Sequence, residues 1–203
     1  MTIKPLYNID QAHLGNWGHN GYRSGWKYEA VREAGNEGFH FIIKPRKLEE
    51  TFVKYWHMDT KDILELNEIA AQGHSFGAYD NGKLIGYIIC EDRDWNNTLF
   101  IETFLIAESY RGKGIGSLLI TELIKHAGEK KYRLIELEVQ NTNFPAIMFY
   151  QKNGFSITGF FELCSCMFGS LVNFFACGIK LFLVIFICFS ISEFGMKLLN
   201  IRI

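Results

Sequence analysis

The sequence predicts an α+β fold whose sheet is mixed, mostly antiparallel, and covered by helices on both faces. Two strand-like segments, 75–79 and 83–90, flank an Asp-Asn-Gly turn at 80–82, which is a strong hairpin signal. An alternation of strand and helix in the order β-α-β-α-β follows between 99 and 161. Hairpins followed by such an alternation imply one sheet with both strand directions and helices packed on its faces.

Length, charge and cysteine content limit the classes of protein. At 203 residues the chain can form one domain with a sizeable core plus some additional segments. Its formal net charge of −1 offers no electrostatic argument for a nucleic-acid partner. No apolar secretory segment follows Met1, so we expect a cytoplasmic protein. Apart from Cys90, the cysteines crowd into the C-terminal tail without metal-ligand spacing, so we predict neither a metal site nor a disulfide framework.

The first zone, residues 1–38, is rich in glycine, tryptophan and tyrosine, and part of it reads as loop. Segments 26–33 and 39–44 are predicted to pair as a hairpin across 34–38. The aromatic side chains either pack on the sheet, which is the favoured interpretation, or line the mouth of a substrate site.

The second zone, residues 39–162, holds the alternating elements. Before the hairpin at 75–90, helices are predicted over 47–56 and 61–71. The alternation then comprises strand 99–106, helix 115–128, strand 134–139, a short helix from Pro145 that ends at Gly154, and strand 155–161. In strand 134–139 the apolar residues share one face and the glutamates the other, namely Ile135, Leu137 and Val139 against Glu136 and Glu138.

A glycine-rich turn joins strand 99–106 to helix 115–128. It consists of Arg111, Gly112, Lys113, Gly114, Ile115 and Gly116. Such a turn exposes successive backbone N–H groups, the helix N-terminus adds partial positive charge, and glycines let a pyrophosphate approach the main chain. With two cationic side chains at its mouth, the turn predicts a phosphate cradle, although many strand–helix joints carry glycine for steric reasons.

Two blocks of this zone resemble the GNAT acetyltransferase superfamily. Its Arg/Gln-x-x-Gly-x-Gly/Ala motif is matched by Arg111, Gly114 and Gly116. The run 137–155 is similar to the superfamily's Asn-x-x-Ala-x-x-Phe-Tyr-x-x-x-Gly-Phe element. The Leu-Glu-x-Gln form at the start of this run, and Trp95-Asn96 ahead of the strand, are similar to streptothricin-type N-acetyltransferases. The resemblance covers about residues 26–160 of the chain.

The resemblance implies acetyl-CoA as the acetyl donor and a fold whose central strands, 99–106 and 134–139, are splayed to admit the thioester. The N–H groups of 111–116 would hold the pyrophosphate, and Asn143 would contact the pantetheine arm. The main chain of Phe104, Leu105 and Ile106 would pair with that arm like an added strand. A free N–H near Leu105 would face the developing oxyanion.

Acetyl transfer to an amine benefits from a base, because an ammonium of pKa ~10.4 leaves under about one molecule in a thousand as free amine at neutral pH. Glu102 is the candidate base. By strand parity it shares a face with Phe100, Phe104 and Ile106, and an apolar setting raises a carboxyl pKa toward the useful range. The alternative is a glutamate paired with an arginine or solvated at the sheet edge. Tyr150 lies where the resemblance places the proton donor to the leaving thiolate, and its alternative is a packed aromatic.

Other candidates have less support. Glu136 and Glu138 either orient a cationic acceptor or form a solvated or ion-paired face, and the second interpretation is favoured. His57, His74 and the remaining histidines form no constellation and are interpreted as structural. Trp95-Asn96 either closes the acceptor side or is a turn between strands.

The third zone, residues 163–203, changes character. Between 163 and 192 the only charge is Lys180, and no period-2 pattern is visible. The stretch 171–191 is long enough for a membrane anchor, since a bilayer core about 30 Å thick needs roughly 20 helical residues. We rank an aberrant, frame-shifted end first, a membrane anchor through 163–192 second, and an unusual but folded last strand third.

The predicted function is transfer of an acetyl group from acetyl-CoA to a primary amine. A small-molecule acceptor such as a streptothricin-like antibiotic, which would imply antibiotic resistance, is favoured over a protein N-terminus or lysine. The alternative is a membrane-tethered or truncated CoA-binding protein with little catalysis. The sequence leaves a homodimer open.

Overall fold

The computed structural model describes residues 1–10, 13, 17–18, 20–35, 38–163 and 182–190. Seven strands form one sheet in the order β1-β4-β5-β6-β7-β9-β8, and β2 and β3 form a separate hairpin. The sheet strands are β1 (Thr2–Pro5), β4 (Phe76–Asp80), β5 (Lys83–Arg93), β6 (Thr98–Ile106), β7 (Leu134–Gln140), β8 (Ser156–Leu163) and β9 (Phe182–Ser190). The other elements are β2 (Tyr22–Gly35), β3 (Gly38–Lys54), α2 (Thr60–Ala70), α3 (Ile115–Lys130) and α4 (Phe144–Lys152).

The sheet is mixed and mostly antiparallel, as the sequence predicts. Only β6 and β7 pair in parallel among the described strands. The predicted turn between β4 and β5 is present, with φ of 47° at Asn81 and 79° at Gly82. Positive φ at both central residues is what a type I′ hairpin turn requires, and Asn and Gly are the residues that tolerate it.

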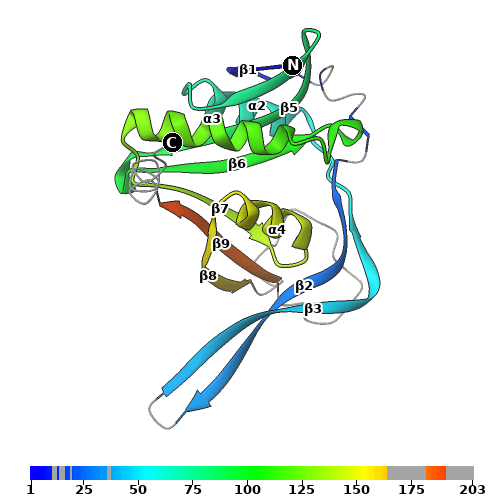
Figure 1. Ribbon diagram of the computed structural model, residues 1–203, viewed down its shortest axis with the longest axis vertical. Helices are drawn as coiled ribbons and strands as arrows, with labels where there is room; N and C mark the ends of the chain where they lie inside the picture. The colour runs from blue at the N-terminus through cyan, green and yellow to red at the C-terminus, as the bar shows by residue number, and fades with distance from the viewer. Residues whose placement is uncertain (11–12, 14–16, 19, 36–37, 164–181, 191–203) are drawn as a thin grey trace, which may run out of the picture.

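Helices cover both faces of this sheet (Figure 1). On one face α3 and α4 contribute Leu119 and Ile147 to the larger hydrophobic core, which also contains the three apolar residues of β7. On the other face α2 contributes Ile63 and Ala70 to a second core around Tyr87. The predicted arrangement is therefore confirmed, and the strand alternation predicted for 134–139 is correct.

The hairpin β2–β3 projects from the body of the molecule (Figure 1). It confirms the pairing predicted for 26–33 with 39–44, but it is longer than expected. The predicted helix over 47–56 is wrong, because residues up to Lys54 form the second half of β3. Cross-strand pairing with β2, such as Lys54 opposite Tyr22, supplies backbone partners that outweigh the helical spacing of this segment.

The N-terminal zone also contains an edge strand that was not predicted from the sequence. Residues Thr2–Pro5 form β1, which pairs with β4. Pro5 is compatible with this strand because an edge position does not need every N–H for the ladder. The aromatic residues of the zone divide between the two interpretations, since Trp17 is buried against Tyr87 while Tyr22 lines a cavity.

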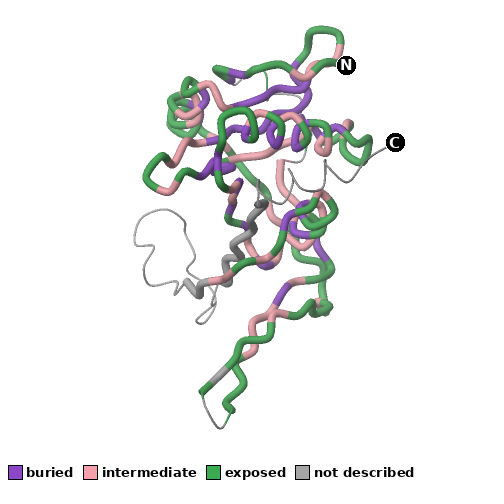
Figure 2. Tube along the Cα trace, turned by 60° about the vertical axis from the view of Figure 1, so that its left-hand side comes forward, coloured by how far each residue is buried: buried purple, intermediate pink, exposed green. Residues whose placement is uncertain are grey.

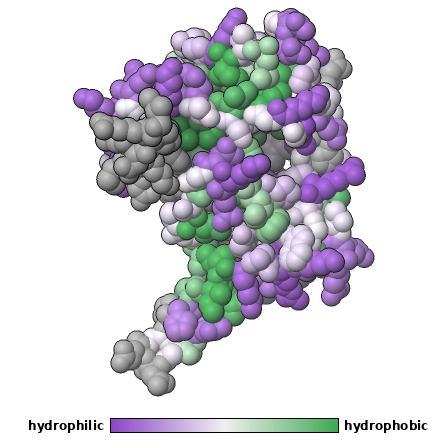
Figure 3. All heavy atoms as spheres, viewed as in Figure 1, coloured by the Kyte–Doolittle hydropathy of each residue, from purple (hydrophilic) through white to green (hydrophobic). Residues whose placement is uncertain are grey.

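The far part of the hairpin is mostly exposed (Figure 2). Hydrophobic residues gather on its surface near the body (Figure 3). The ring of Phe41 in β3 lies 4.9 Å from the ring of Phe160 in β8, measured between centroids. Tyr28 anchors the hairpin more deeply, because its N–H donates to the carbonyl of Asn141 and the Asn141 side chain donates back. These contacts hold the hairpin against β8 and the end of β7.

A strand from the C-terminal tail is inserted into the sheet. β9 pairs antiparallel with β7 along the whole length of β7, and it pairs antiparallel with β8 on its other side. A folded last strand was the least favoured prediction for the tail, yet residues 182–190 form one. Pairing with β7 and β8 makes this run a strand although it shows no period-2 pattern. The rest of the predicted tail, 164–181 and 191–203, lies outside the described residues, so the frame-shift interpretation is not tested. Within the described residues, no helix is both long and apolar enough to cross a membrane.

The prediction that the histidines form no constellation is also wrong. His74 Nδ1 lies 3.0 Å from His126 Nε2, and the Tyr132 hydroxyl lies 3.4 Å from His74 Nε2. His74 lies in the loop just before β4 and His126 lies in the last turns of α3, so only tertiary packing brings them together. Within the described part of the chain, no group of three or more His, Cys, Asp or Glu side chains is arranged to hold a metal.

Candidate active site

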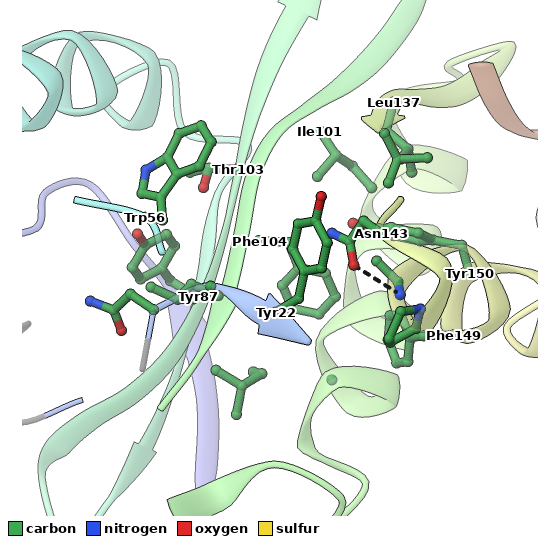
Figure 4. Close-up of a pocket in the computed structure, with 18 of the residues that line it drawn as sticks. Tyr22, Trp56, Tyr87, Ile101, Thr103, Phe104, Leu137, Asn143, Phe149 and Tyr150 are labelled. Atoms are coloured by element: carbon green, nitrogen blue, oxygen red, sulfur yellow. Dashed lines mark hydrogen bonds between the residues drawn. The ribbon is translucent and has the colours of Figure 1, made fainter. Parts of the chain in front are cut away.

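The central strands β6 and β7 part from each other along their length. They pair only from Thr98 to Phe100 and from Leu134 to Glu136, and their remaining residues diverge. A cavity of about 960 Å³ opens between them, lined by the second halves of both strands, the glycine turn, α2, α4 and the base of the hairpin. Figure 4 shows Ile101 and Phe104 of β6 on one side of this gap and Leu137 and Tyr150 on the other. The splaying implied by the resemblance is confirmed.

The glycine turn lies where β6 leads into α3, at the open end of the gap. Gly112 and Gly114 have φ of +74° and +81°, values that an L side chain rarely adopts. A Cβ placed on either glycine would meet nothing within 4 Å, so the space beside the turn is open. Gly114 is the N-cap of α3 and the first turn of the helix has no side-chain cap. Its N–H groups are thus available to an anion.

Three other residues of the turn do not have the roles expected in a simple phosphate cradle. A Cβ on Gly116 would lie 3.0 Å from the Phe149 ring, so this glycine serves the packing of α3 on α4. Lys113 does not line the cavity, and its ammonium lies 5.0 Å from the Tyr110 ring centroid. The Arg111 side chain points its Nε at the Ile106 carbonyl, 2.9 Å away.

Backbone alternation decides which groups of β6 face the gap. Ala107 N donates to Ile85 O of β5 at 2.9 Å, so the N–H groups two and four residues earlier also point toward β5. Leu105 therefore directs its N–H at β5. The N–H and C=O groups of Phe104 and Ile106 face the gap instead, so the free N–H expected near Leu105 is that of Phe104. The expected pairing of an extended arm with the main chain is correspondingly open to Phe104 and Ile106 but not to Leu105.

Glu102 occupies a β-bulge in β6. Ile89 of β5 pairs with Thr103 and Cys90 pairs with Ile101, which leaves Glu102 as the extra residue. A bulge breaks the two-residue alternation. As a result Ile101 and Phe104 pack in the same core, and the predicted shared face for Glu102, Phe104 and Ile106 is wrong.

The Glu102 carboxylate faces the α2 side of the sheet and is accessible in the cavity. Partial withdrawal from water raises its pKa, the charges of Glu91, Glu138 and Glu65 raise it further, and Arg93 opposes them. Four carboxylates line the cavity, from Asp62, Glu65, Glu102 and Glu138. We call these four residues the acidic side, and we call the turn Arg111–Gly116 with the gap-facing backbone of Phe104 and Ile106 the loop side.

The two glutamates of β7 have different environments. Glu138 is exposed and belongs to the acidic side, whereas Glu136 accepts a hydrogen bond from Thr98 Oγ1 at 2.7 Å and lies 4.0 Å from Arg93. The ion-paired interpretation thus holds for Glu136 alone. Trp95 is 80% exposed on a turn between β5 and β6 and does not line the cavity.

Tyr150 and Asn143 come from α4 and its N-cap. Tyr150 is 6% exposed and its ring packs against Phe149 and Phe155. It lines the cavity, and burial raises its pKa, so the phenol stays protonated. Asn143 Oδ1 accepts from Ala146 N at 3.3 Å, which caps α4 and leaves the Nδ2 group for a ligand (Figure 4).

Sequence reasoning missed the residues that the hairpin base brings to the cavity. Tyr22, Lys54 and Trp56 line it, as does Asn20, whose buried Oδ1 pairs with no described residue. The aromatic content of the first zone is the one signal that could have suggested Tyr22. Nothing in the local pattern indicates that Lys54 and Trp56 approach a site built by β6 and β7.

The motif, the splayed strands and the glycine turn can now be compared with known proteins. A family model described as the acetyltransferase (GNAT) family matches residues 45–155, which is more than half of the chain. The chain belongs to the GNAT acetyltransferase family.

Relatives and a solved structure agree with this membership. The GNAT chain is 38% identical to the streptothricin acetyltransferase of Streptomyces lavendulae over 79 residues, which are 39% of this chain and 42% of that protein. It is 32% identical to streptothricin acetyltransferase A of Bacillus subtilis over 111 residues, 54% of this chain and 64% of that one. The matches thus span less than two thirds of each relative. A Bacillus anthracis structure in complex with acetyl coenzyme A shares the fold, with a TM-score of 0.65, 21% identity, and coverage of 93% and 98%.

Membership of the GNAT family implies acetyl-CoA as cosubstrate, and the residues present fit it. The loop side offers uncapped helix N–H groups and open space beside Gly112 and Gly114 for a diphosphate. The gap-facing backbone of β6 offers an unpaired strand edge to an extended amide-containing arm. Asn20 adds a buried amide oxygen that lacks a donor among the described residues. Each of these groups would be satisfied by a part of that molecule.

Proposed function

We propose that this GNAT protein transfers the acetyl group of acetyl-CoA to a primary amine of a small, multiply cationic molecule of the streptothricin type. The observation that carries the proposal is the position of Glu102. Its carboxylate lies at the point where β6 leaves β7, on the acidic side, next to the gap that would hold the thioester.

Glu102 would serve as the general base, directly or through one water. A carboxylate with a raised pKa is a stronger proton acceptor than an ordinary one. The neighbouring carboxylates of Glu65 and Glu138 raise the affinity of this region for the incoming cation. The acceptor would therefore arrive as an ammonium and lose its proton at Glu102.

Two further groups would stabilise the reacting thioester. The Phe104 N–H faces the gap and would donate to the carbonyl oxygen as it becomes an oxyanion. Tyr150 would donate a hydrogen bond to the departing thiolate. Within the described residues its hydroxyl hydrogen-bonds to no side chain, and its raised pKa keeps the proton in place. After the free amine has attacked, its nitrogen carries a positive charge in the tetrahedral adduct. As the C–S bond breaks, a proton from this nitrogen neutralises the thiolate and leaves a neutral amide.

The choice of a multiply cationic acceptor follows from the acidic side rather than from the cavity as a whole, which Lys54, Arg111 and Lys152 also line. Four carboxylates line it on the acidic side, and Trp56 adds an aromatic face that already holds the Lys54 ammonium at 4.8 Å from the ring centroid. An acceptor with several ammonium groups would meet favourable partners along this wall. The two relatives, both named streptothricin acetyltransferases, support the same class.

Two measurements test the proposal. Isothermal titration with acetyl-CoA measures binding, and thiol release is followed with a streptothricin-type amine, spermidine and a neutral monoamine. We expect binding, and release that is fastest with the multiply charged amines. Binding without release from any amine would support the alternative, a CoA-binding protein with little catalysis. Faster release with the monoamine would contradict the role of the acidic side.

A further inference from the structure

A short segment of the hairpin base crosses the open end of the gap between β6 and β7. It consists of Asn20, Gly21 and Tyr22, and we call it the bridge. On the β6 side the Gly21 carbonyl accepts from Arg111 Nη1 at 3.2 Å. On the β7 side the Tyr22 hydroxyl donates to Gln140 Oε1 at 3.0 Å. Figure 4 shows the Tyr22 ring in the gap between β6 and α4.

The β7 end of the bridge is held firmly. The Tyr22 hydroxyl also lies 2.7 Å from Thr142 Oγ1, and burial raises its pKa, so it remains a donor at neutral pH. Lys54, which faces Tyr22 across the hairpin, donates to the same Gln140 oxygen at 2.9 Å. Gln140 Oε1 thus accepts two hydrogen bonds and fixes both strands of the hairpin base to the end of β7.

The β6 end depends on a side chain that has a second use. Arg111 donates to the Ile106 carbonyl as well as to the Gly21 carbonyl. The Ile106 carbonyl faces the gap, where an extended arm would pair with it. The same arginine belongs to the turn that would bind the diphosphate. One guanidinium therefore links the bridge to both parts of the proposed cosubstrate site.

We propose that the bridge is a strap that closes over the pantetheine arm, with Tyr22 as its fixed end and Arg111 as its releasable end. The inference rests on the proposed function. Arg111 exchanges the two carbonyls for the diphosphate, which frees the Ile106 carbonyl to accept an amide N–H of the arm. Asn20 Oδ1, buried and without a described partner, accepts another. Tyr22 keeps its contacts with β7, positions the strap over the arm and slows the departure of CoA.

The test compares two tyrosine variants of the same hairpin. Tyr22→Phe removes the fixed contact, and Tyr28→Phe is the matched control, because the Tyr28 hydroxyl contacts Gln151 at 3.5 Å and does not line the cavity. Dissociation of CoA is followed by stopped-flow displacement in the full chain. We expect Tyr22→Phe to release CoA about fivefold faster, the effect of one net hydrogen bond. The KM for acetyl-CoA should rise with little loss of kcat, and Tyr28→Phe should match the wild type.

The outcomes distinguish a failure of the strap proposal from a failure of the proposed acetyltransferase function. A wild-type dissociation rate in a folded Tyr22→Phe protein overturns the strap while thiol release continues. Equal acceleration in Tyr28→Phe also overturns it, because any disturbance of the hairpin would then suffice. Should Tyr22→Phe fail to fold, Thr142→Val removes the second partner of the hydroxyl, and faster CoA release supports the strap while an unchanged rate overturns it. Failure of the wild type to bind acetyl-CoA overturns both proposals.

Discussion

The loop side and the acidic side face the same cavity but are built in different ways. The loop side is one short stretch of chain in which glycine conformation and a helix N-terminus do the work. The acidic side collects carboxylates from α2, β6 and β7, which are far apart in sequence. The first is a backbone site that tolerates little change in conformation. The second is a charge distribution, so single substitutions should change its chemistry without emptying the other site.

We expect the strongest effect from a substitution at Glu102, which should impair catalysis and leave acetyl-CoA binding intact. Glu102→Gln should lower kcat by about 100-fold, because a positioned general base contributes roughly 10²–10⁴-fold. The dissociation constant for acetyl-CoA should stay unchanged, since Glu102 is not on the loop side. Because the pKa of Glu102 is raised, lowering the pH should protonate it, and reduce wild-type activity, at a higher pH than for an ordinary carboxyl group. The Glu102→Gln variant should not show this loss of activity at acidic pH. Glu122→Gln, on the exposed surface of α3, is the control. A wild-type kcat in Glu102→Gln would remove the glutamate from the mechanism.

A substitution on the loop side should instead weaken the binding of acetyl-CoA. Gly114→Val forces a β-branched residue to a φ of +81°, which costs at least about 1–2 kcal/mol and turns the N–H groups of the loop. Acetyl-CoA affinity measured by titration should fall about tenfold or more. Gly128→Val places the same side chain in α3 at a position with open space and should leave affinity unchanged. Equal affinity in the two variants would show that the loop does not bind the diphosphate.

A smaller effect is expected at Tyr150, which lines the cavity but belongs to neither the loop side nor the acidic side. Tyr150→Phe should reduce kcat about fivefold to tenfold, because one hydrogen bond to the thiolate is worth about 1–1.5 kcal/mol. Acetyl-CoA affinity and Tm should change little. Tyr132→Phe is the control, since Tyr132 is buried to a similar extent, 7% against 6% exposed, and lies outside the cavity. An unchanged kcat would assign Tyr150 to packing alone.

The smallest effect concerns stability. A carboxyl whose pKa is raised by folding binds its proton more tightly in the folded state, so its ionised form opposes folding. Glu102→Gln should therefore raise Tm at pH 7, by about 1–2 °C because solvent screens this accessible group. The gain should disappear as pH falls below the carboxyl range, where the wild type is protonated in both states. A lower Tm at pH 7 would contradict the repulsion assigned to the acidic side.

Local patterns predicted the parts of the fold that local chemistry determines. The Asn81-Gly82 turn, the helix after the glycine turn and the alternation in β7 each depend on residues that are neighbours in sequence. The errors arise where pairing overrides local preference. Residues 47–54 have helical spacing yet form a strand opposite β2, and 182–190 enter the sheet between β7 and β8.

The site divides along the same line. The glycine turn of the loop side could be recognised from the sequence alone, because positive φ at glycine and exposed N–H groups at a helix start are properties of six consecutive residues. Tertiary structure, by contrast, sets the direction of Glu102, since one bulge in β6 reverses the strand alternation. It also decided that Tyr22 and Gln140 meet across 118 positions of chain. Side-chain direction and long-range contacts depend on strand register, and register is set by the whole sheet rather than by any single segment.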